Sequence, residues 1–403
     1  MDKKPEKLVP EVRFKGFTDD WEQRKLGETL TGFEYGLNTP ATDYDGINKY
    51  LRITDIDDVS HKFDISHLTS PKLKDDNYLL ANGDILFART GASVGKSYRY
   101  SNIDGKVYYA GFLIKAHIKD HFSTNFIFDT TLLPRYHYFV QVTSMRSGQP
   151  GINAKEYQKY IIYAPSENEQ NKISDLILTI QKLIDLQQRK LEQLKLLEKT
   201  LQQKLFPNSF QEKPLLRILH GDNSWWNSYI GEVFTERVDK GSSEKLLSVS
   251  ITDGVYPFDE SKRKNNSSDD KHNYKKVFQN DIAYNSMRLW QGALGVSKYE
   301  GIVSPAYTVL KPLPNQNSIF YESMFKNIDM LHIFQRNSQG LTSDTWNLKF
   351  NQLQHIKIKT TNLNSQNKIA KLLIKIEELK NNESNYYHNL MTLKKYLLQK
   401  LFI

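Results

Sequence analysis

The sequence predicts an α+β fold built twice, in which two globular units with twisted β-sheets are separated by two long helices that pair as an antiparallel coiled coil. Three observations support this fold class. The chain repeats itself, each half ends in about forty residues with helical periodicity, and each half begins with β-rich segments separated by turn signals. The repeat predicts pseudo-two-fold symmetry. We expect a first globular domain with an N-terminal segment, a first long helix, a second globular domain and a second long helix, over residues 1–164, 165–207, 208–362 and 363–403.

The internal repeat is clearest where the two halves end. Residues 194–206 read LKLLEKTLQQKLF and residues 390–402 read LMTLKKYLLQKLF, so that eight of thirteen positions are identical at an offset of 196. The same offset aligns residues 170–173 with residues 366–369, which both read QNKI. Toward the start of each half the offset grows to 204, as loop deletions inside a globular unit would produce. Agreement in one order along the chain indicates a duplication.

The composition is that of a basic, soluble, cysteine-free protein. Of the 403 residues, 39% are hydrophobic and none is cysteine, which excludes disulfides, thiol catalysis and cysteine-ligated zinc. The net charge of +9 favours polyanionic partners such as nucleic acid, because neutralised phosphates release their counterions. No apolar run approaches the roughly 18 residues that span a bilayer, and the first residues lack the apolar core of a signal peptide. We therefore expect a cytoplasmic protein without a membrane partner.

Each globular unit has the pattern of short strands separated by turns. The turn signals are Asn-Gly, Asp-Gly and Ser-Gly pairs between stretches rich in β-branched and aromatic residues. Such strands, with one short helix per unit, predict an α+β module around a twisted sheet. The expected strands are 49–54, 83–89, 106–117 and 160–163 in the first unit and 246–251, 281–287, 307–310 and 355–359 in the second, and the expected helices lie near 124–139 and 321–335.

Each globular unit is followed by the pattern of a long helix. Residues 166–206 contain no Gly or Pro, and their apolar residues alternate at spacings of four and three, which is a heptad seam. The pattern returns over residues 364–403, where polar residues 380–384 interrupt it. A helix of the first segment would be roughly 60 Å long, which exceeds a small domain. We therefore expect the helices to pair as a rod with one globular unit at each end; the alternative is that each helix packs only on its own unit. The residues expected in this pairing are Ile173, Ile177, Ile180, Ile184, Leu191, Leu194, Leu201, Leu205, Ile369, Leu373, Ile376, Leu390, Leu397 and Leu401.

Each unit also carries two polar loops whose residue types suit DNA. We expect residues 88–97 to correspond to 286–295 and residues 146–155 to 336–344, so that both copies have arginines in equivalent loops. Arg, Gln and Asn read base edges in the major groove, whereas Ser, Thr, Lys and backbone N–H groups beside Gly hold phosphates. Taken singly, each of these residues could instead belong to an ordinary solvated loop. The residues expected to contact DNA are Arg89, Thr90, Ser93, Lys96, Arg146, Ser147, Gln149, Lys155, Arg288, Trp290, Gln291, Arg336, Asn337, Gln339, Thr342 and Ser343.

The sequence contains no catalytic constellation. Residues 91–97, GASVGKS, have three residues between the glycines where a phosphate-binding loop needs four, and the sequence after them has β-and-turn character where that loop needs a helix. A methyltransferase would show a glycine-rich cofactor loop and an Asn/Asp-Pro-Pro-aromatic tetrapeptide, and neither is present. Glu378-Leu379-Lys380 has the Glu-x-Lys spacing of many nucleases but falls in a helix, and no Asp/Glu/His cluster supports a metal site. We expect this chain to have no catalytic residue, no metal and no cofactor.

The order of several motifs resembles the DNA-specificity subunit of type I restriction-modification enzymes. The chain reads VPEVRFKGFTDDWEQRKLGE at 9–28, Gly-Asp-Ile-Leu at 83–86 and Pro-x-x-x-Glu-Gln-x-x-Ile at 165–173. Gln-Lys-Leu-Phe closes both halves, at 203–206 and 399–402. The likeness covers essentially the whole chain.

The resemblance implies that each globular unit is a target-recognition domain that reads one half of a bipartite, asymmetric site in double-stranded DNA. The paired helices would be spacers that bind two modification (methyltransferase) subunits, which carry S-adenosylmethionine. Restriction (motor-nuclease) subunits, which use ATP and Mg²⁺, would join that core, and this chain itself would not be an enzyme. The second copy departs from the family pattern where Ser365 replaces the expected Glu and Arg217-Ile218 replaces Arg-Phe. From the residues alone, the alternative is a coiled-coil scaffold whose two heads bind proteins.

Overall fold

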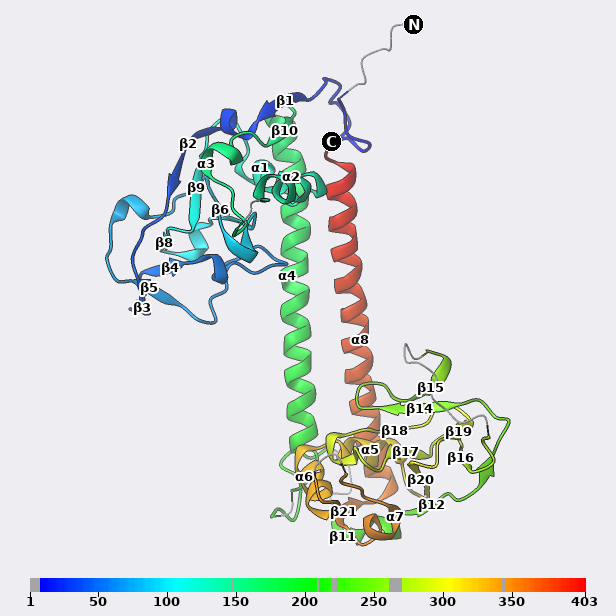
Figure 1. The fold of residues 1–403 in the computed structure, drawn as a ribbon. Coiled ribbons are helices and arrows are strands. Elements are labelled where there is room, and N and C mark those ends of the chain that lie inside the picture. Colours follow the sequence, from blue (N-terminus) through cyan, green and yellow to red (C-terminus); the bar gives the residue numbers. More distant parts are fainter. Residues whose placement is uncertain (1–7, 146–147, 209, 219–223, 261–269, 343–344) are drawn as a thin grey trace, which may run out of the picture. The chain divides into compact units, whose positions relative to one another are not determined.

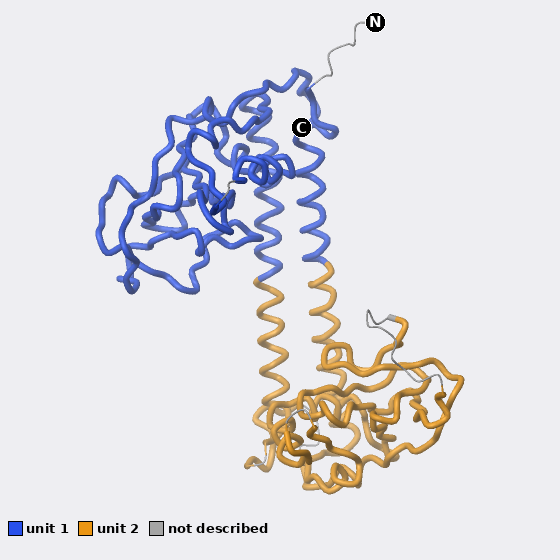
Figure 2. Tube along the Cα trace, in the orientation of Figure 1, with its two compact units in different colours: residues 1–188, 386–403 blue, residues 189–385 orange. Residues whose placement is uncertain are grey.

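The computed structural model describes residues 8–145, 148–208, 210–218, 224–260, 270–342 and 345–403. The chain forms two compact units, one made of residues 1–188 and 386–403 and the other of residues 189–385 (Figure 2). Each unit therefore contains a β-rich body together with one end of each long helix. The four-part division at residues 164, 207 and 362 stays a prediction.

The first unit is built around a four-stranded antiparallel sheet with strand order β2-β9-β6-β7 (Figure 1). All residues of the inner strand β6 are buried, so this strand anchors the sheet in the core. Three small strand pairs, β1-β10, β3-β5 and β4-β8, surround the sheet. The elements are β1 Glu22–Lys25, β2 Leu30–Tyr35, β3 Ala41–Asp43, β4 Lys49–Leu51, β5 Thr69–Pro71, β6 Asp84–Ala88, β7 Ser97–Arg99, β8 Val107–Tyr109, β9 Leu113–Ile118, α1 Thr124–Thr130, α2 Pro134–Ser144, α3 Ala154–Tyr157 and β10 Ile161–Ala164.

Two elements of the first unit are shorter than the sequence predicts. The strand expected over residues 106–117 is divided into β8 and β9 by a turn, in which Leu113 donates its N–H to the carbonyl of Ala110 at 2.8 Å. The helix expected near residues 124–139 is divided into α1 and α2. Pro134 has no N–H to donate and is compatible only with the first turn of a helix, so a new helix begins there.

The core of the first unit joins the sheet to the ends of the long helices. α4 (Glu167–Lys204) begins in this unit and α8 (Leu363–Lys400) ends in it. Just after α8, the ring of Phe402 stacks on the ring of Phe126 with centroids 5.0 Å apart, and Trp21 meets both rings edge-on. The Leu-Phe pair that closes the second half of the sequence is therefore part of the core of the first unit.

The second unit repeats the four-stranded sheet, here with strand order β12-β20-β17-β18. A three-stranded sheet, β13-β16-β19, and the pairs β14-β15 and β11-β21 complete it. The elements are β11 Trp225–Tyr229, β12 Phe234–Glu236, β13 Lys240–Gly241, β14 Leu247–Ser250, β15 Gly254–Pro257, β16 Tyr274–Val277, β17 Ile282–Asn285, β18 Leu294–Val296, β19 Gly301–Val303, β20 Tyr307–Pro312, α5 Ser318–Phe325, α6 Ile328–Asn337, α7 Phe350–Leu353 and β21 Lys357–Thr361.

The core of the second unit uses the first Leu-Phe pair in the same way. Leu205 and Phe206 are buried just after α4, and the Phe206 ring lies 5.3 Å from the ring of Phe320. Trp225 meets Phe320 at 6.0 Å, as Trp21 meets the equivalent Phe126 in the first unit. The Leu-Phe pair that closes each half is thus buried in a hydrophobic core, the first pair in the second unit and the second pair in the first unit.

The repeated QNKI segment holds the start of each long helix to its globular body. In the first unit Gln170 accepts the N–H of Ser123 at 3.0 Å and donates to the carbonyl of Pro165 at 2.9 Å. In the second unit Gln366 accepts the N–H of Asn317 at 2.9 Å and donates to the carbonyl of Thr361 at 2.8 Å. Both glutamines are buried.

The positions at which the second copy differs from the family pattern remove a further contact between a long helix and its globular unit. In the first unit Arg13 donates from Nε and Nη2 to the two carboxylate oxygens of Glu169, each at 2.8 Å, and the carboxylate is almost completely buried. In the second unit Ser365 stands in place of that Glu, and Arg217 is exposed. The ion pair that ties the N-terminal segment to α4 is therefore a feature of the first unit.

The two long helices run antiparallel within each unit. In the first unit Ile180 and Ile184 of α4 form a cluster with Leu390 of α8. In the second unit Lys190 pairs with Glu383, and Glu198 pairs with Lys380 at 2.6 Å. Residue numbers rise along α4 while they fall along α8, as the predicted antiparallel pairing requires.

Most of the heptad residues fall into two groups according to what they contact, and the exceptions are Leu191, Leu194 and Ile376. Those near the helix ends belong to the globular cores, whereas Ile180, Ile184 and Leu390 pack between the helices. Each helix therefore packs on a globular body and on the other helix. Among the fourteen predicted positions, those that are only half-buried are Leu191, Leu194, Leu201 and Leu397. No helix in the described ranges has a stretch long and apolar enough to cross a membrane.

Candidate nucleic-acid interface

In the first unit the two predicted loops lie side by side. The N–H of Ile152 donates to the carbonyl of Arg89 at 2.9 Å, and the N–H of Gly91 donates to the carbonyl of Pro150 at 3.0 Å. Thr90 forms a strand-like bridge with Gly151. Segments some sixty residues apart in the sequence thus form one continuous surface at the end of β6.

The side chains of the first unit that are predicted to contact DNA differ in how deeply they are buried and in whether they already contact other residues of the unit. The Arg89 guanidinium lies over the Tyr35 ring at 5.1 Å, and its Nε is buried without a hydrogen-bond partner in the described part of the chain. Lys96 is largely occupied within the unit, because its ammonium lies 2.5 Å from the carboxylate of Asp58. Thr90 and Ser93 are half-buried, and the remaining candidates, Gln149 and Lys155, are exposed.

In the second unit the loop after β17 meets residues 346–348, which follow the predicted loop 336–344. The N–H of Leu348 donates to the carbonyl of Ser286 at 2.9 Å, and the rings of Trp290 and Trp346 make an edge-to-face contact at 5.3 Å. Arg288 donates to the side chain of Gln291 at 3.0 Å. The candidates that are exposed here are Arg288, Arg336, Asn337, Gln339 and Thr342. Arg146, Ser147 and Ser343 lie outside the described residues.

The backbone hydrogen bonds define which loop positions correspond. Ile152 and Leu348 each donate to the residue directly after the central strand, which is Arg89 in the first unit and Ser286 in the second. Arg89 thus corresponds to Ser286 and not to Arg288. Arg336 lies in the last turn of α6, not in a loop. The loops after β6 and β17 each contain an arginine, but the two arginines occupy different positions, because Arg, Gln and Gly occur in many loops and do not fix a register.

The geometry also rules out a phosphate-binding loop of the nucleotide-hydrolase kind in the first loop. Residues Gly91–Ser93 form a single 3-10 turn, and the chain then enters β7, whereas that kind of loop opens an α-helix. In the described residues, His, Asp and Glu side chains do not gather in threes at any place that could hold a metal ion.

A comparison with known protein families identifies the kind of domain that carries the first pair of loops. Residues 18–196 match the family model of the type I restriction modification DNA specificity domain. This part of the chain belongs to that family. The family expected from the order of the motifs is therefore confirmed. No curated protein sequence matches the chain.

Solved structures extend the likeness of this specificity domain to the whole fold. The S subunit of a type-I restriction-modification system from M. genitalium has a TM-score of 0.62 at 12% identity, over 98% of this chain and 99% of that one. A structure described by the complex assembly and conformational transition of the type I R-M system has a TM-score of 0.52 at 15% identity, over 95% of this chain and 97% of that one. At such identities the likeness shows the fold, and it confirms the predicted class with two β-rich units and paired long helices.

Two residues at the base of the loops were not identified from the sequence. In the specificity domain Tyr157 donates its hydroxyl to the carbonyl of Ala88 at 2.7 Å, and in the second unit Tyr284 donates to the carbonyl of Leu348 at 3.1 Å. Burial raises the pKa of both hydroxyls, so both stay protonated donors at neutral pH. Tyrosine is common in this chain, so no local signal distinguishes these two from other core tyrosines.

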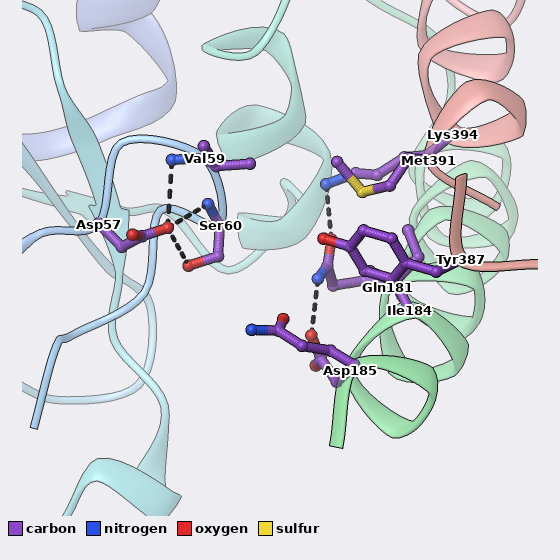
Figure 3. A pocket seen from close by; sticks show the side chains of 10 residues that line it. Asp57, Val59, Ser60, Gln181, Ile184, Asp185, Tyr387, Met391 and Lys394 are labelled. Atoms are coloured by element: carbon purple, nitrogen blue, oxygen red, sulfur yellow. Dashed lines mark hydrogen bonds between the residues drawn. The ribbon is translucent and has the colours of Figure 1, made fainter. Parts of the chain in front are cut away.

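A cavity of about 310 Å³ in the first unit lies between residues 57–60 and the two long helices (Figure 3). On its helix side Lys394 donates to Gln181 at 2.7 Å, and Gln181 donates to Asp185 at 2.8 Å. Lys62 pairs with the same aspartate, which ties this loop to α4. The lining includes none of the residues predicted to contact DNA, so the cavity belongs to the joint between body and helices.

Proposed function

We propose that this chain is the DNA-specificity subunit of a type I restriction-modification enzyme and that it reads a bipartite, asymmetric site in double-stranded DNA. The observation that carries the proposal is the pair of loop surfaces, one on each of two similar scaffolds, with different side chains at corresponding positions. Two unlike surfaces on a duplicated scaffold suit two unlike half-sites. Residues 1–164 and 208–362 are then the target-recognition domains.

The chemistry of the loops suits both kinds of DNA contact. Exposed Gln149 and Arg288 have the donors and acceptors that read base edges, whereas Lys155 and the backbone N–H groups near glycines suit phosphates. The net charge of +9 strengthens the attraction to a polyanion. Arg89 lies in the loop surface of the first unit, half-buried and with its guanidinium over the Tyr35 ring, and its charge adds to the attraction for phosphates.

The long helices, residues 165–207 and 363–403, act as spacers and as the docking surface for two modification subunits. The exposed apolar side chains on α4 and α8 suit such docking, since they contribute to neither globular core. S-adenosylmethionine is bound by the modification subunits, and ATP and Mg²⁺ by the restriction subunits. The chain itself contributes recognition and no chemistry, and the assembly works in the cytoplasm.

Reconstitution with the cognate modification subunit tests the proposal. A map of methylated adenines in the source genome would supply the candidate sequence, and methylation of duplexes with and without that sequence would then be compared. We expect methylation of one interrupted sequence only. Absence of sequence-selective methylation, together with indifference to DNA at low salt, contradicts the proposal and favours a scaffold whose heads bind proteins.

A further inference from the structure

The loop after β17 holds Arg288 at a fixed place on the surface of the second unit. Its N–H donates to the carbonyl of Asn285 at 3.0 Å, and its own carbonyl accepts the N–H groups of Gln291 and Ala293 at 3.0 and 3.1 Å. Gly292, with a φ of +90°, turns the chain back into β18. The backbone of Arg288 is therefore held by three hydrogen bonds, whereas its side chain is exposed.

The same loop is also anchored by its apolar side chains. Leu289 is buried in the core of the second unit, and the ring of Trp290 meets the ring of Trp346 edge-to-face at 5.3 Å. The indole Nε1 of Trp290 donates to the carbonyl of Met287 at 3.2 Å. A partner that binds the exposed side of this loop does not have to order it first, and binding therefore loses little free energy to ordering.

Gln291 orients the guanidinium of Arg288. Residues 289–291 form a 3-10 turn directly after Arg288, and side chains three residues apart lie over one another in such a turn. Arg288 accordingly donates from Nη1 to Oε1 of Gln291 at 3.0 Å. In the part of the chain that the structure describes, Nε and Nη2 of Arg288 have no hydrogen-bond acceptor. The guanidinium is thus held at one nitrogen and keeps parallel N–H donors for a planar ligand.

The first unit has no arginine at this place. Its loop comprises residues 88–96, and the loop of the second unit comprises residues 285–293, so the two have equal lengths. Counting from the strands matches Arg288 with Gly91, and superposing the 3-10 turns matches it with Thr90. Neither residue can present two parallel donors. The oriented guanidinium is therefore a feature of the second unit.

We infer that Arg288 reads a guanine in the major groove of the half-site bound by the second unit, and that Gln291 is its positioning residue. This inference rests on the proposed function. Guanine presents two neighbouring acceptors in the major groove, O6 and N7, and an arginine fork donates to both. Adenine presents a donor in place of O6, so it cannot accept both bonds. The half-site of the first unit is read by other groups.

The test measures binding of the full chain, assembled with its modification subunits, to the duplex that this complex methylates. Each guanine is replaced in turn by 7-deazaguanine, which keeps its base pairing but lacks the N7 acceptor. For the unsubstituted chain we expect a roughly tenfold loss of affinity at one guanine. Arg288→Met should bind the natural duplex roughly tenfold more weakly or worse, and 7-deazaguanine at that position should then have no further effect.

Variants of Gln291 test the positioning role. Gln291→Leu should reduce the effect of 7-deazaguanine from about tenfold to about threefold, because the guanidinium is no longer oriented. Gln291→Glu should restore the effect, because its carboxylate accepts the same hydrogen bond. If Gln291→Leu weakens binding to both duplexes by the same factor, Gln291 does not position Arg288. Arg217→Met, which removes an exposed arginine outside the loops, is the control and should leave the effect at about tenfold.

Other outcomes separate this inference from loss of folding and from the proposed function. Arg288→Gln keeps a polar side chain on the loop and should lose the sensitivity to guanine N7 as Arg288→Met does, and assembly with the modification subunits shows that each variant is folded. The inference alone is overturned if no guanine is sensitive, or if the sensitive guanine stays sensitive in both variants, which would indicate a phosphate contact. Absence of selective binding by the unsubstituted complex overturns both proposals.

Discussion

A single buried carboxamide fixes each long helix to its globular body. Gln170 and Gln366 each accept an N–H from the residue that caps a short helix, Ser123 or Asn317, and each donates to a carbonyl just before the long helix. Buried N–H and C=O groups need such partners, because an unpaired group keeps the full cost of its desolvation. The repeated glutamine therefore works as a rigid joint between helix and domain.

Replacing this glutamine by an apolar residue of similar size should loosen the joint. For Gln170→Leu we expect the first unit to lose about 2–4 kcal/mol of unfolding free energy, since two buried backbone groups lose their partners. Hydrogen exchange resolved by peptide should show the loss around Ser123 and the start of α4. Gln193→Leu, an exposed position on the same helix, is the control, and an equal effect in both variants would contradict the role of the joint.

Asp129 gives the first unit a pH dependence of its own. Burial raises its pKa from 3.8 to about 7, although Lys394 and Arg99 oppose the shift. The folded state therefore holds a proton that the unfolded state has released, so the contribution of this group to stability falls as pH rises from about 4 to about 7.

Asp129→Asn removes that dependence. When the pH rises from 5 to 8, the unfolding free energy of the native chain should fall by about 2 kcal/mol relative to that of the variant. Urea unfolding of both proteins at the two pH values measures this difference. A difference between the proteins that stays constant with pH would show that the proton is not held in the folded state.

At the scale of elements, polar residues 380–384, which interrupt the apolar stripe of α8, lie across from charged residues of α4. Lys380 pairs with Glu198 at 2.6 Å, and Glu383 pairs with Lys190. These residues stand where the apolar heptad stripe of α8 is broken. The helix pair therefore exchanges apolar packing for ion pairs in this stretch, which favours one alignment of the helices over shifted ones.

Charge reversal tests that alignment. Glu383→Lys should cost about 0.5–1 kcal/mol, because it sets two ammonium groups against each other at a partly exposed site. The double variant Lys190→Glu with Glu383→Lys should recover most of this loss. A double-mutant cycle from thermal unfolding measures the coupling, and a coupling near zero would leave the ion pair without a structural role.

Elements differed in how well their sequences predicted them. The long helices were predicted because heptad spacing is local, and the polar break at residues 380–384 was recognised, although its partners on α4 were not. The positions within the loops do not follow from residue type, because Arg288 matches Arg89 in type but not in backbone register. The contact of Arg89 with the Tyr35 ring joins segments that are distant in the sequence. So do the hydrogen bonds of Tyr157 and Tyr284 at the base of the loops, and residue type alone does not reveal such contacts.

At the scale of the whole molecule, each unit is completed by the helix end of the other half of the chain. Phe206 packs on Phe320 in the second unit, and Phe402 packs on Phe126 in the first. The offset of 196 predicted the duplication, but it did not show that the closing signature belongs to the core of the other unit. That assignment follows only from the antiparallel pairing of α4 and α8.

An alanine substitution of the phenylalanine that closes one half of the sequence should therefore destabilise the unit formed mainly by the other half. Phe402→Ala should destabilise the first unit by about 3–5 kcal/mol, and Phe206→Ala should do the same to the second. Limited proteolysis followed by mass spectrometry would locate the cleavage, near Trp21 and Phe126 for the first variant and near Trp225 and Phe320 for the second. Cleavage confined to the half of the chain that carries the substitution would contradict the arrangement.

The placement of Phe402 in the core of the first unit has a consequence for synthesis on the ribosome. The segments around Trp21 and Phe126 are made early, but the ring that completes their core is made after all the strands of the second unit. The second unit receives Phe206 before most of its own strands exist, so it can close in the order in which it is translated. The first unit must wait as an incomplete core until residues 398–402 leave the exit tunnel, and the nascent chain exposes apolar surface during that interval.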